Sequence, residues 1–193
     1  MKIERPKENQ PIPSHAERVF KGIIFDVYQW EQELYDGTKA TFEKLKRMDS
    51  AKVFPVLSDG RILLLEQSQP GKEPYVGGVG GRMEEGEEAL DAVKRELLEE
   101  TGYEASEFIL LQAAHTTAKT DYVVYYFIAK GCKKVTEQSL DSGERISLLP
   151  VTFDEFLQMA RSKHFIDKDM VPLLYEALLV PAKKEELKKA FGL

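Results

Sequence analysis

Three glutamates near the middle of the chain have the spacing that brings side chains together on a helix. Glu96, Glu99 and Glu100 stand at positions i, i+3 and i+4, so they share one face of a helix that spans them. Like charges on one face repel each other, and Lys94 and Arg95 offset only part of that charge. Magnesium takes oxygen ligands, usually carboxylates, waters and phosphate oxygens. The spacing therefore favours a divalent metal site that handles phosphate.

Four glycines precede these glutamates in a short stretch, at positions 77, 78, 80 and 81. Glycine lets the backbone approach an anion closely or turn a carbonyl towards a metal. Each feature alone has an ordinary explanation, because glutamate-rich helices are usually solvated surface helices and glycine-rich loops are usually turns. Divalent ions held against a pyrophosphate offset the charge of the leaving phosphate and acidify a water. Together, the two features predict hydrolysis of a phosphoanhydride.

A longer pattern joins the two features. The segment from Gly81 to Tyr103 reads GRMEEGEEALDAVKRELLEETGY. It resembles the Nudix box, which is a glycine, five residues, a glutamate, seven residues, and then Arg-Glu-aliphatic-any-Glu-Glu-any-Gly-aliphatic. Every charged and glycine position agrees, and Tyr103 is the one departure, at an aliphatic place where it is large and apolar enough to pack. The resemblance implies an α+β fold, the Nudix α/β/α sandwich with a mixed β-sheet.

The resemblance also implies roles for the residues of the box. It implies that the enzyme binds Mg²⁺, with Mn²⁺ as a substitute. The implied metal ligands are Glu96, Glu99, Glu100 and the carbonyl of Gly80 or Gly81. For Glu99, support of the true ligands is the alternative to direct ligation. Glu87 and Arg95 are expected to pair and hold the loop on the helix. Glu99 and Glu100 are also candidate catalytic residues.

Beyond the box, most of the chain resembles the ADP-ribose pyrophosphatase branch of this family. The stretch LLLEQSQ precedes the box as it does in that branch, and SLDSGERISLLPVTFDEFLQM looks like the part that carries an extra acidic residue near the metals. Glu144 is the matching position, with Asp141 beside it. Glu144 is therefore a candidate metal ligand or general base, and a solvated loop glutamate is the alternative.

Departures from that branch bear on the substrate. The stretch AAHTTAKTDY lacks the usual proline after the box and has Thr116 and Thr117 near that place. Gln69 stands where an arginine is usual, and a glycine replaces a glutamate before the box. A bidentate arginine clamp is not replaced conservatively, so Gln69 is a candidate substrate-binding residue. Thr117, near the place of the missing proline, is another.

The sequence is compatible with several substrates. ADP-ribose, cleaved to AMP and ribose 5-phosphate, is the first candidate among nucleoside diphosphate sugars. GDP-mannose, a dinucleoside polyphosphate and a nucleoside triphosphate are alternative substrates of the same chemistry, and a non-catalytic module that senses a nucleotide is an alternative of another kind.

The N-terminal segment looks like the extension with which that branch forms a homodimer. Residues 19–47 are strand-like on both sides of an Asp36-Gly37 turn and predict one β-hairpin. Tyr28 and Trp30 alternate onto one side of it, as candidates for stacking on a base across the dimer or as ordinary interface aromatics. His115 is expected simply to end a strand at the surface.

Further elements follow from apolar periodicity. Residues 51–57 and 61–67 predict a second hairpin of central strands, and the glycine-rich stretch after it predicts irregular structure up to residue 87 or 88. A helix is expected from there to a cap at Gly102. Strands are expected at 108–114, 122–130 and 146–151, and helices at 153–162 and 167–180. We expect an arm and hairpin over 1–48, a Nudix domain over 49–182 and a solvated helical tail over 183–193.

Composition narrows the partners. The chain has 193 residues, a formal charge of −6 and a single cysteine, Cys132. A net negative charge argues against a broad nucleic-acid-binding surface, and no apolar stretch approaches the roughly 20 residues that cross a bilayer. One cysteine forms no internal disulfide, and the charged start is unlike a secretory signal. We therefore expect a cytoplasmic protein that takes a small nucleotide as its partner, without nucleic acid or membrane.

Overall fold

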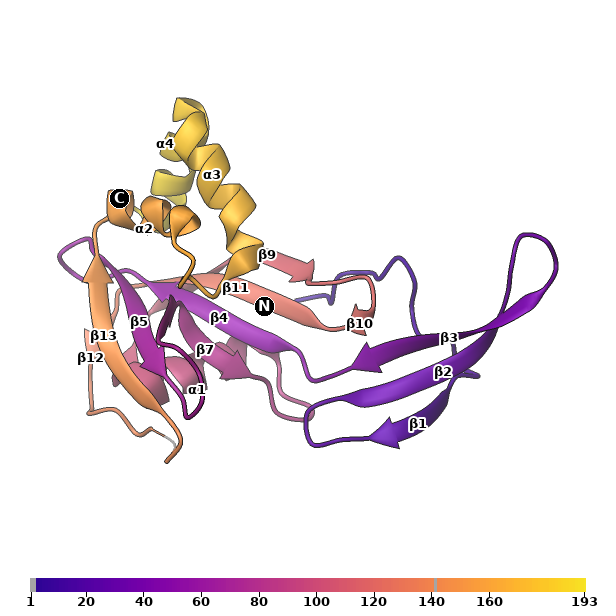
Figure 1. Cartoon of the computed structure of the whole chain (residues 1–193). Helices are drawn as coiled ribbons and strands as arrows, with labels where there is room; N and C mark the ends of the chain where they lie inside the picture. Colours follow the sequence, from indigo (N-terminus) through magenta and orange to yellow (C-terminus); the bar gives the residue numbers. More distant parts are fainter. Residues whose placement is uncertain (1–2, 141) are drawn as a thin grey trace.

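The computed structural model describes residues 3–140 and 142–193 of the chain. Figure 1 shows a body in which sheets lie between helices, and a long ribbon of strands that projects from one side of it. Strands and helices are mixed along the chain as the sequence predicts. The α/β/α arrangement and the N-terminal extension are confirmed.

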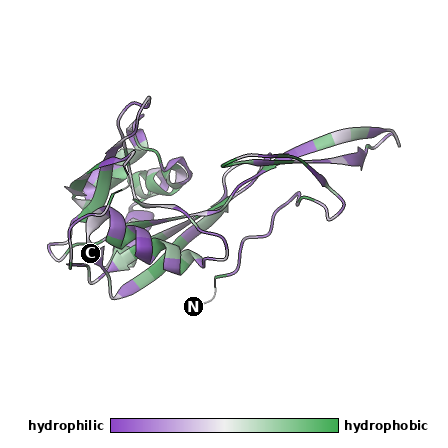
Figure 2. Ribbon diagram, turned by 90° about the horizontal axis from the view of Figure 1, so that it is seen from below, coloured by the Kyte–Doolittle hydropathy of each residue, from purple (hydrophilic) through white to green (hydrophobic). Residues whose placement is uncertain are grey.

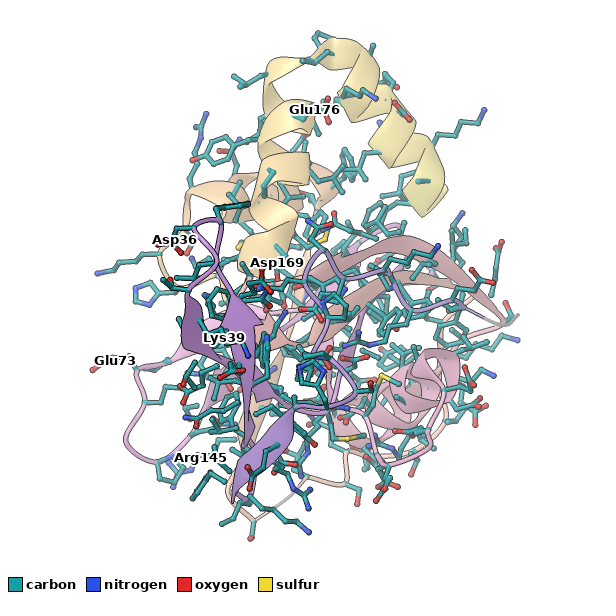
Figure 3. All side chains as sticks on the ribbon, turned by 90° about the vertical axis from the view of Figure 1, so that its right-hand side faces the viewer. Asp36, Lys39, Glu73, Arg145, Asp169 and Glu176 are labelled. Carbon is teal, nitrogen blue, oxygen red and sulfur yellow. The ribbon has the colours of Figure 1, made fainter. Side chains whose placement is uncertain are left out.

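The projecting ribbon has three strands of the N-terminal segment. β1 (Glu17–Lys21), β2 (Asp26–Glu33) and β3 (Lys39–Lys46) pair antiparallel in sequence order, and β10 (Thr120–Asp121) adds a short parallel strand to β3. The prediction of one hairpin was incomplete, because a tight turn closed by the Gly22 N–H on the Phe25 carbonyl makes a second hairpin. Asp36 and Lys39 mark the end of the β2–β3 hairpin in Figure 3.

The first sheet of the body is mixed. Its order is β7 (Val79–Arg82), β4 (Ser50–Pro55), β11 (Val123–Lys130) and β9 (Glu107–His115). β4 and β11 run parallel, and the outer strands pair antiparallel to them. The central strands are buried almost throughout, as their continuous apolar runs predict.

The second sheet consists of β13 (Arg145–Val151), β5 (Ile62–Ser68) and β6 (Tyr75–Gly77). The prediction that residues 51–57 and 61–67 form a hairpin was wrong, since β4 and β5 share only an isolated bridge between Val56 and Ile62. Beyond that bridge the two strands separate. β4 pairs with β7 and β11, and β5 pairs with β13 and β6. β4 and β5 therefore belong to two different sheets.

The glycine-rich stretch also contains strands, β6 and β7, where irregular structure was expected. At Gly80, whose φ is 130°, an added Cβ would lie 2.1 Å from the carbonyl oxygen of Ala51 on β4. A residue with a side chain would therefore push β7 away from β4. The glycine here allows close strand pairing instead of preventing it.

Helix α1 (Ala89–Thr101) covers one side of the body. Its apolar stripe of Ala89, Ala92, Val93 and Leu97 is buried in one cluster with residues of the first sheet. Gly102 ends the helix in the left-handed conformation, with φ 73°, and donates its N–H to the Leu98 carbonyl. The predicted helix and its cap are confirmed. Next to it, β8 (Tyr103–Glu104) pairs with β12 (Lys133–Lys134).

The other side carries α2 (Phe153–Gln158), α3 (Val171–Leu179) and α4 (Pro181–Phe191), with the short 3₁₀ helices η1 (Met159–Arg161) and η2 (Lys168–Met170). Thr152 and Glu155 form a capping box that starts α2. The helix at the end of the chain was expected to be solvated, but Leu187 and Phe191 are buried, and the Phe191 ring lies 5.4 Å from that of Phe156. The last helix therefore closes the core.

Figure 2 shows the molecule from below, coloured by hydropathy. Hydrophobic residues are concentrated in the body, while the projecting ribbon alternates hydrophobic and hydrophilic positions. None of the helices among the described residues is both long and apolar enough to cross a membrane.

Candidate active site

A cleft of about 1010 Å³ opens where α1, the glycine-rich strands and the second sheet meet. Glu96, Glu99 and Glu100 enter it from α1, and Glu144 enters it just before β13. Four carboxylate side chains from distant parts of the sequence thus line one space. The helical spacing of the first three was predicted from the sequence, and Glu144 was expected beside them from the family resemblance.

Glu100 is the most deeply placed of these carboxylates, with 5% of its surface exposed. Its Oε2 accepts the N–H of Gly80 at 2.6 Å. Burial raises the pKa of Glu100 to about 8, an effect that nearby Lys52 and the Gly80 N–H reduce and that the charges of Glu96 and Glu144 increase. Without a further cation, the charged form of this carboxyl group is disfavoured.

Glu96 lies against the glycine-rich backbone. A Cβ added to Gly81 would lie 2.7 Å from Oε1 of Glu96, so glycine is required for this side chain to occupy its place. Burial raises the pKa of Glu96, and the neighbouring Arg95 guanidinium partly reverses the effect. Glu99 is more exposed, with 47% of its side chain accessible, and it accepts a hydrogen bond from Arg95. The three glutamates therefore occupy graded depths in the cleft.

Arg95 ties the loop to the helix. Its Nε and Nη2 reach the two carboxylate oxygens of Glu87 at 3.0 and 3.1 Å, and Glu87 also accepts the N–H of Glu84. The hydrogen bond from Arg95 holds the pKa of Glu87 below its ordinary value. The predicted pairing of Glu87 with Arg95 is confirmed. Since Arg95 also contacts Glu96 and Glu99, it orients the acidic side of the cleft.

The donor set fits divalent metal ions. Carboxylate oxygens are the ligands that magnesium and similar hard cations prefer. Several of them converge here, and burial, together with the charges of Glu96 and Glu144, raises the pKa of the most buried one, Glu100. Glu96, Glu99 and Glu100 would hold such ions, and Glu144 lines the same cleft. Gly80 lines the same cleft, and its N–H is taken up by Glu100.

Three cationic side chains that line the cleft, those of Lys52, Arg47 and Arg82, were not predicted from the sequence. Lys52 extends from β4, with its Nζ 3.4 Å from the Gly78 carbonyl oxygen and 3.8 Å from Oδ1 of Asp167. Arg47 follows β3, and its guanidinium carbon lies 4.3 Å from the centre of the Tyr122 ring. The available signal was a lysine within the apolar run of residues 51–57. It was overlooked because charged residues at such places usually reach solvent.

The candidate substrate-binding residues are dispersed. Gln69 lines the carboxylate cleft. Tyr28 instead lines a separate pocket of about 310 Å³ with Arg5 and Asp121. Trp30 is only 6% exposed, and its ring packs against Phe42 of the same chain at 6.0 Å. Thr117 is exposed and lies outside the set of residues that lines the cleft. Asp141 lies outside the described residues. Within one chain, only Gln69 thus joins the carboxylates.

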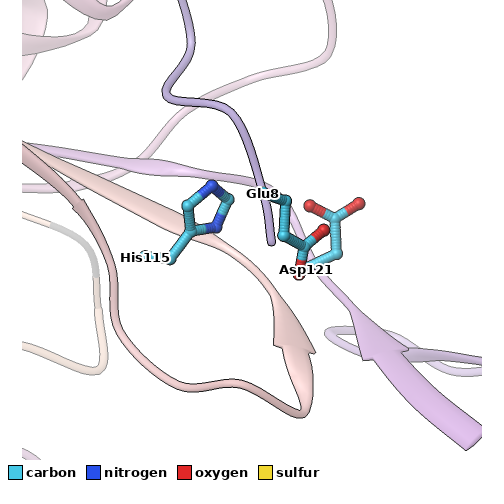
Figure 4. A group of neighbouring side chains, drawn as sticks. All are labelled: Glu8, His115 and Asp121. Atoms are coloured by element: carbon cyan, nitrogen blue, oxygen red, sulfur yellow. The ribbon is translucent and has the colours of Figure 1, made fainter. Parts of the chain in front are cut away.

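A second group of titratable side chains, Glu8, His115 and Asp121, is shown in Figure 4. Each already has a partner, since Glu8 contacts Lys44, Asp121 accepts a hydrogen bond from Arg5 at 2.6 Å, and the His115 Nε2 lies 3.0 Å from the Pro6 carbonyl oxygen. These contacts fix the N-terminal arm against β3, β9 and β10. His115 ends β9, as expected, but it is half-buried beneath the arm.

Comparison with known proteins decides the family. The model of the NUDIX domain matches residues 46–174, which is most of the chain. The chain belongs to the Nudix family. It is a hydrolase that acts on phosphorus-containing acid anhydrides, and hydrolases of this family generally use divalent metals.

Three curated relatives support this assignment. The Nudix chain is 30% identical to the ADP-ribose pyrophosphatase of Bacillus subtilis (strain 168), over 78% of this chain and 83% of that one. It is 29% identical to the methanol dehydrogenase activator of Bacillus methanolicus, over 81% and 86%. It is 27% identical to the ADP compounds hydrolase NudE of Escherichia coli (strain K12), over 53% and 56%.

A solved structure supports the fold of the Nudix chain independently. The crystal structure of an ADP compounds hydrolase matches it with a TM-score of 0.70, over 88% of this chain and 93% of that one. The identity is 18%, so this likeness concerns the fold alone.

Proposed function

We propose that this Nudix hydrolase uses Mg²⁺ to cleave the pyrophosphate bond of a nucleoside diphosphate sugar, with ADP-ribose as the substrate and AMP and ribose 5-phosphate as the products. The observation that carries the proposal is the convergence of Glu96, Glu99, Glu100 and Glu144 on one cleft. The relative named ADP-ribose pyrophosphatase supports the choice of substrate, since it aligns over most of both chains. Mn²⁺ is expected to substitute for Mg²⁺, because both accept carboxylate and phosphate oxygens.

The residues of the cleft would share the work as follows. Glu96, Glu99 and Glu100, with the carbonyl of Gly80, would hold the metal. Bound divalent ions supply charge compensation on the diphosphate and acidify the attacking water. Glu144 lines the cleft and is the candidate general base, with the exposed Glu99 as the other candidate. Gln69 would contact the substrate at the rim.

We also propose that the enzyme is a homodimer formed through the projecting ribbon. Its first hairpin exposes large apolar side chains, with 58% of Phe20, 97% of Ile23 and 50% of Ile24 accessible. Exposed apolar groups gathered in this way mark interaction surfaces. Ile23 and Ile24 also line the mouth of the carboxylate cleft, so a second copy seated on this hairpin would lie beside the active site. Tyr28 and Thr117 remain candidates for contacts made across such a dimer.

Trp30 would then act by supporting the ribbon from within, because it is buried in its own chain.

For the cell compartment we propose the cytoplasm, whose reducing conditions suit a single buried thiol, Cys132.

A substrate panel tests the function. The purified protein is incubated with ADP-ribose, GDP-mannose, a dinucleoside polyphosphate and a nucleoside triphosphate, with Mg²⁺ or with EDTA, and the products are separated by anion-exchange chromatography. We expect AMP and ribose 5-phosphate from ADP-ribose in Mg²⁺ only, at the highest kcat/KM of the panel. A higher kcat/KM for another compound would replace ADP-ribose as the substrate. Tight binding without turnover of any compound would indicate a sensing module.

A further inference from the structure

Not all of the residues that line the cleft are acidic. There Lys52 of β4, Gln67 of β5 and Tyr75 of β6 line the space. Gln67 and Tyr75 are only 7% and 8% exposed, and 17% of the Lys52 side chain is accessible. These three side chains carry N–H and O–H groups, so hydrogen-bond donors line the same cleft as the carboxylates of α1.

Lys52 is a buried cation held in place by one carboxylate. Asp167 is 3% exposed, and its Oδ2 accepts the Gly78 N–H at 2.6 Å while its Oδ1 lies 3.8 Å from the Lys52 Nζ. Burial lowers the pKa of Lys52, but the charges of Asp167 and Glu100 outweigh burial and raise it above its ordinary value. An ammonium group has three donors, and the contacts to Gly78 and Asp167 are both long. Lys52 therefore retains donor capacity towards the cleft.

Gln67 has a buried donor that nothing in the described chain satisfies. Its Oε1 accepts the Tyr75 hydroxyl at 3.2 Å, which fixes the orientation of the amide. The Nε2 is buried and has no hydrogen-bond partner among the described residues. A buried donor without a hydrogen-bond acceptor reduces the stability of the fold by roughly 1–3 kcal/mol. A side chain held in this way, in the wall of the catalytic cleft, is suited to a ligand that brings an acceptor oxygen.

The charge of Lys52 decides what kind of ligand suits this pair. Gln69, which lines the same cleft, is neutral. Lys52 supplies a positive charge to the same cleft from the strand of the other sheet. An anionic oxygen can accept from both the ammonium and the amide donor, and a hydrogen bond to a charged oxygen is roughly twice as strong as one to a neutral hydroxyl.

We propose that Lys52 and Gln67 form a phosphate-binding subsite, in which both donate to a non-bridging oxygen of the substrate diphosphate while Tyr75 and Asp167 hold them in place. The inference rests on the proposed function, because it assigns the diphosphate to this cleft. Lys52 and Gln67 here are substrate-binding residues, and Asp167 is a positioning residue. Metal binding remains with the glutamates of α1.

The test compares Lys52→Met with the wild type. Affinity for α,β-methylene-ADP, a diphosphate that resists cleavage, is measured by calorimetry in Mg²⁺, and affinity for Mg²⁺ alone is measured separately. We expect K52M to bind the diphosphate about 10- to 100-fold more weakly, the range for loss of one charge-assisted contact. It should bind Mg²⁺ at least as tightly, since a cation has been removed. K94M is the control, because Lys94 lies exposed on α1 and pairs with Asp91.

Two further variants keep the outcome interpretable. K52M leaves the Asp167 carboxylate buried without its cation, so the double variant K52M/D167N removes both charges and should keep the fold while still binding the diphosphate weakly. Q67L tests the amide donor independently and should lose about 10-fold in affinity. Unchanged diphosphate affinity in folded K52M or K52M/D167N would overturn the proposal, as would a loss confined to Mg²⁺ affinity. Failure of the proposed function is distinct, because it is measured as absence of turnover by the wild type.

Discussion

The backbone N–H of Gly80 donates to Oε2 of Glu100 across 2.6 Å. This hydrogen bond joins the glycine-rich strand to the last turn of α1, two segments 20 residues apart. It also directs the buried carboxylate towards the cleft. The candidate metal site is therefore built between a strand and a helix, each of which is fixed by the other.

Replacing Glu100 tests the metal assignment. Even outer partners of metal ligands cost about 10- to 100-fold when removed, so Glu100→Gln is expected to reduce metal-dependent turnover by at least about 100-fold. The amide keeps an acceptor for the Gly80 N–H, and thermal unfolding should show a folded protein. E104Q, at an exposed position just after the helix, is the control. Wild-type turnover by folded E100Q would show that the metal lies elsewhere.

Gly81→Ala tests the packing of the acidic helix against the strand. The new methyl group would lie 2.7 Å from Oε1 of Glu96, so this carboxylate must move. We expect metal affinity to fall about 10-fold or more, as measured by titration with Mn²⁺. The double-mutant cycle with E96A provides the control, since the methyl group then has room. Equal effects of G81A in the two backgrounds would contradict the proposed contact.

Glu87 and Arg95 predict a pH-dependent contribution to stability. Because the pKa of Glu87 is lower in the folded protein than its ordinary value of 4.5, the pair stabilises the fold at pH values above 4.5, and this contribution is lost as the pH falls below it. E87Q should cost about 1 kcal/mol near pH 7, the size expected for a partly exposed bidentate pair. Urea unfolding of both proteins at pH 7 and pH 3.5 measures this difference. A cost that is equal at the two pH values would exclude the ion pair as its source.

Phe20→Asp tests the proposed dimer. A charge placed on the exposed apolar hairpin should be poorly tolerated at an interface, and we expect a shift from dimer to monomer. Sedimentation velocity at matched concentrations gives the mass of each species. The control is L179D, at a position on α3 that is 75% exposed and far along the chain from the hairpin. A wild-type protein that sediments as a monomer, or an F20D variant that remains a dimer, would argue against this interface.

The sequence predicted best those features that depend on local spacing. Helix α1, its buried stripe and its Gly102 cap follow from periodicity and the conformational freedom of glycine, and the pairing of Glu87 with Arg95 follows from the box. The pairing of strands was predicted less well. Residues 51–57 and 61–67 form an apolar pair around a turn, and nothing local shows that Val56 and Ile62 are their last shared bridge.

Residues that act through distant neighbours were also missed. Lys52 looks like a surface lysine until Asp167, more than one hundred positions later, is placed beside it. Phe191 lies in a tail of mixed charge, and only the packing of α4 on α2 shows that it is buried. In both cases the environment of the side chain is created by long-range contacts, which periodicity does not encode.

The contacts of the N-terminal arm imply an order of assembly. Arg5 pairs with Asp49 and with Asp121, the latter 116 residues further along the chain. Residue 5 is translated before residue 121, so the contact that Asp121 offers to the arm does not exist until β10 has been synthesised. Docking of the arm therefore waits for a strand made much later, and nascent chains halted before residue 121 should leave the arm open to proteases.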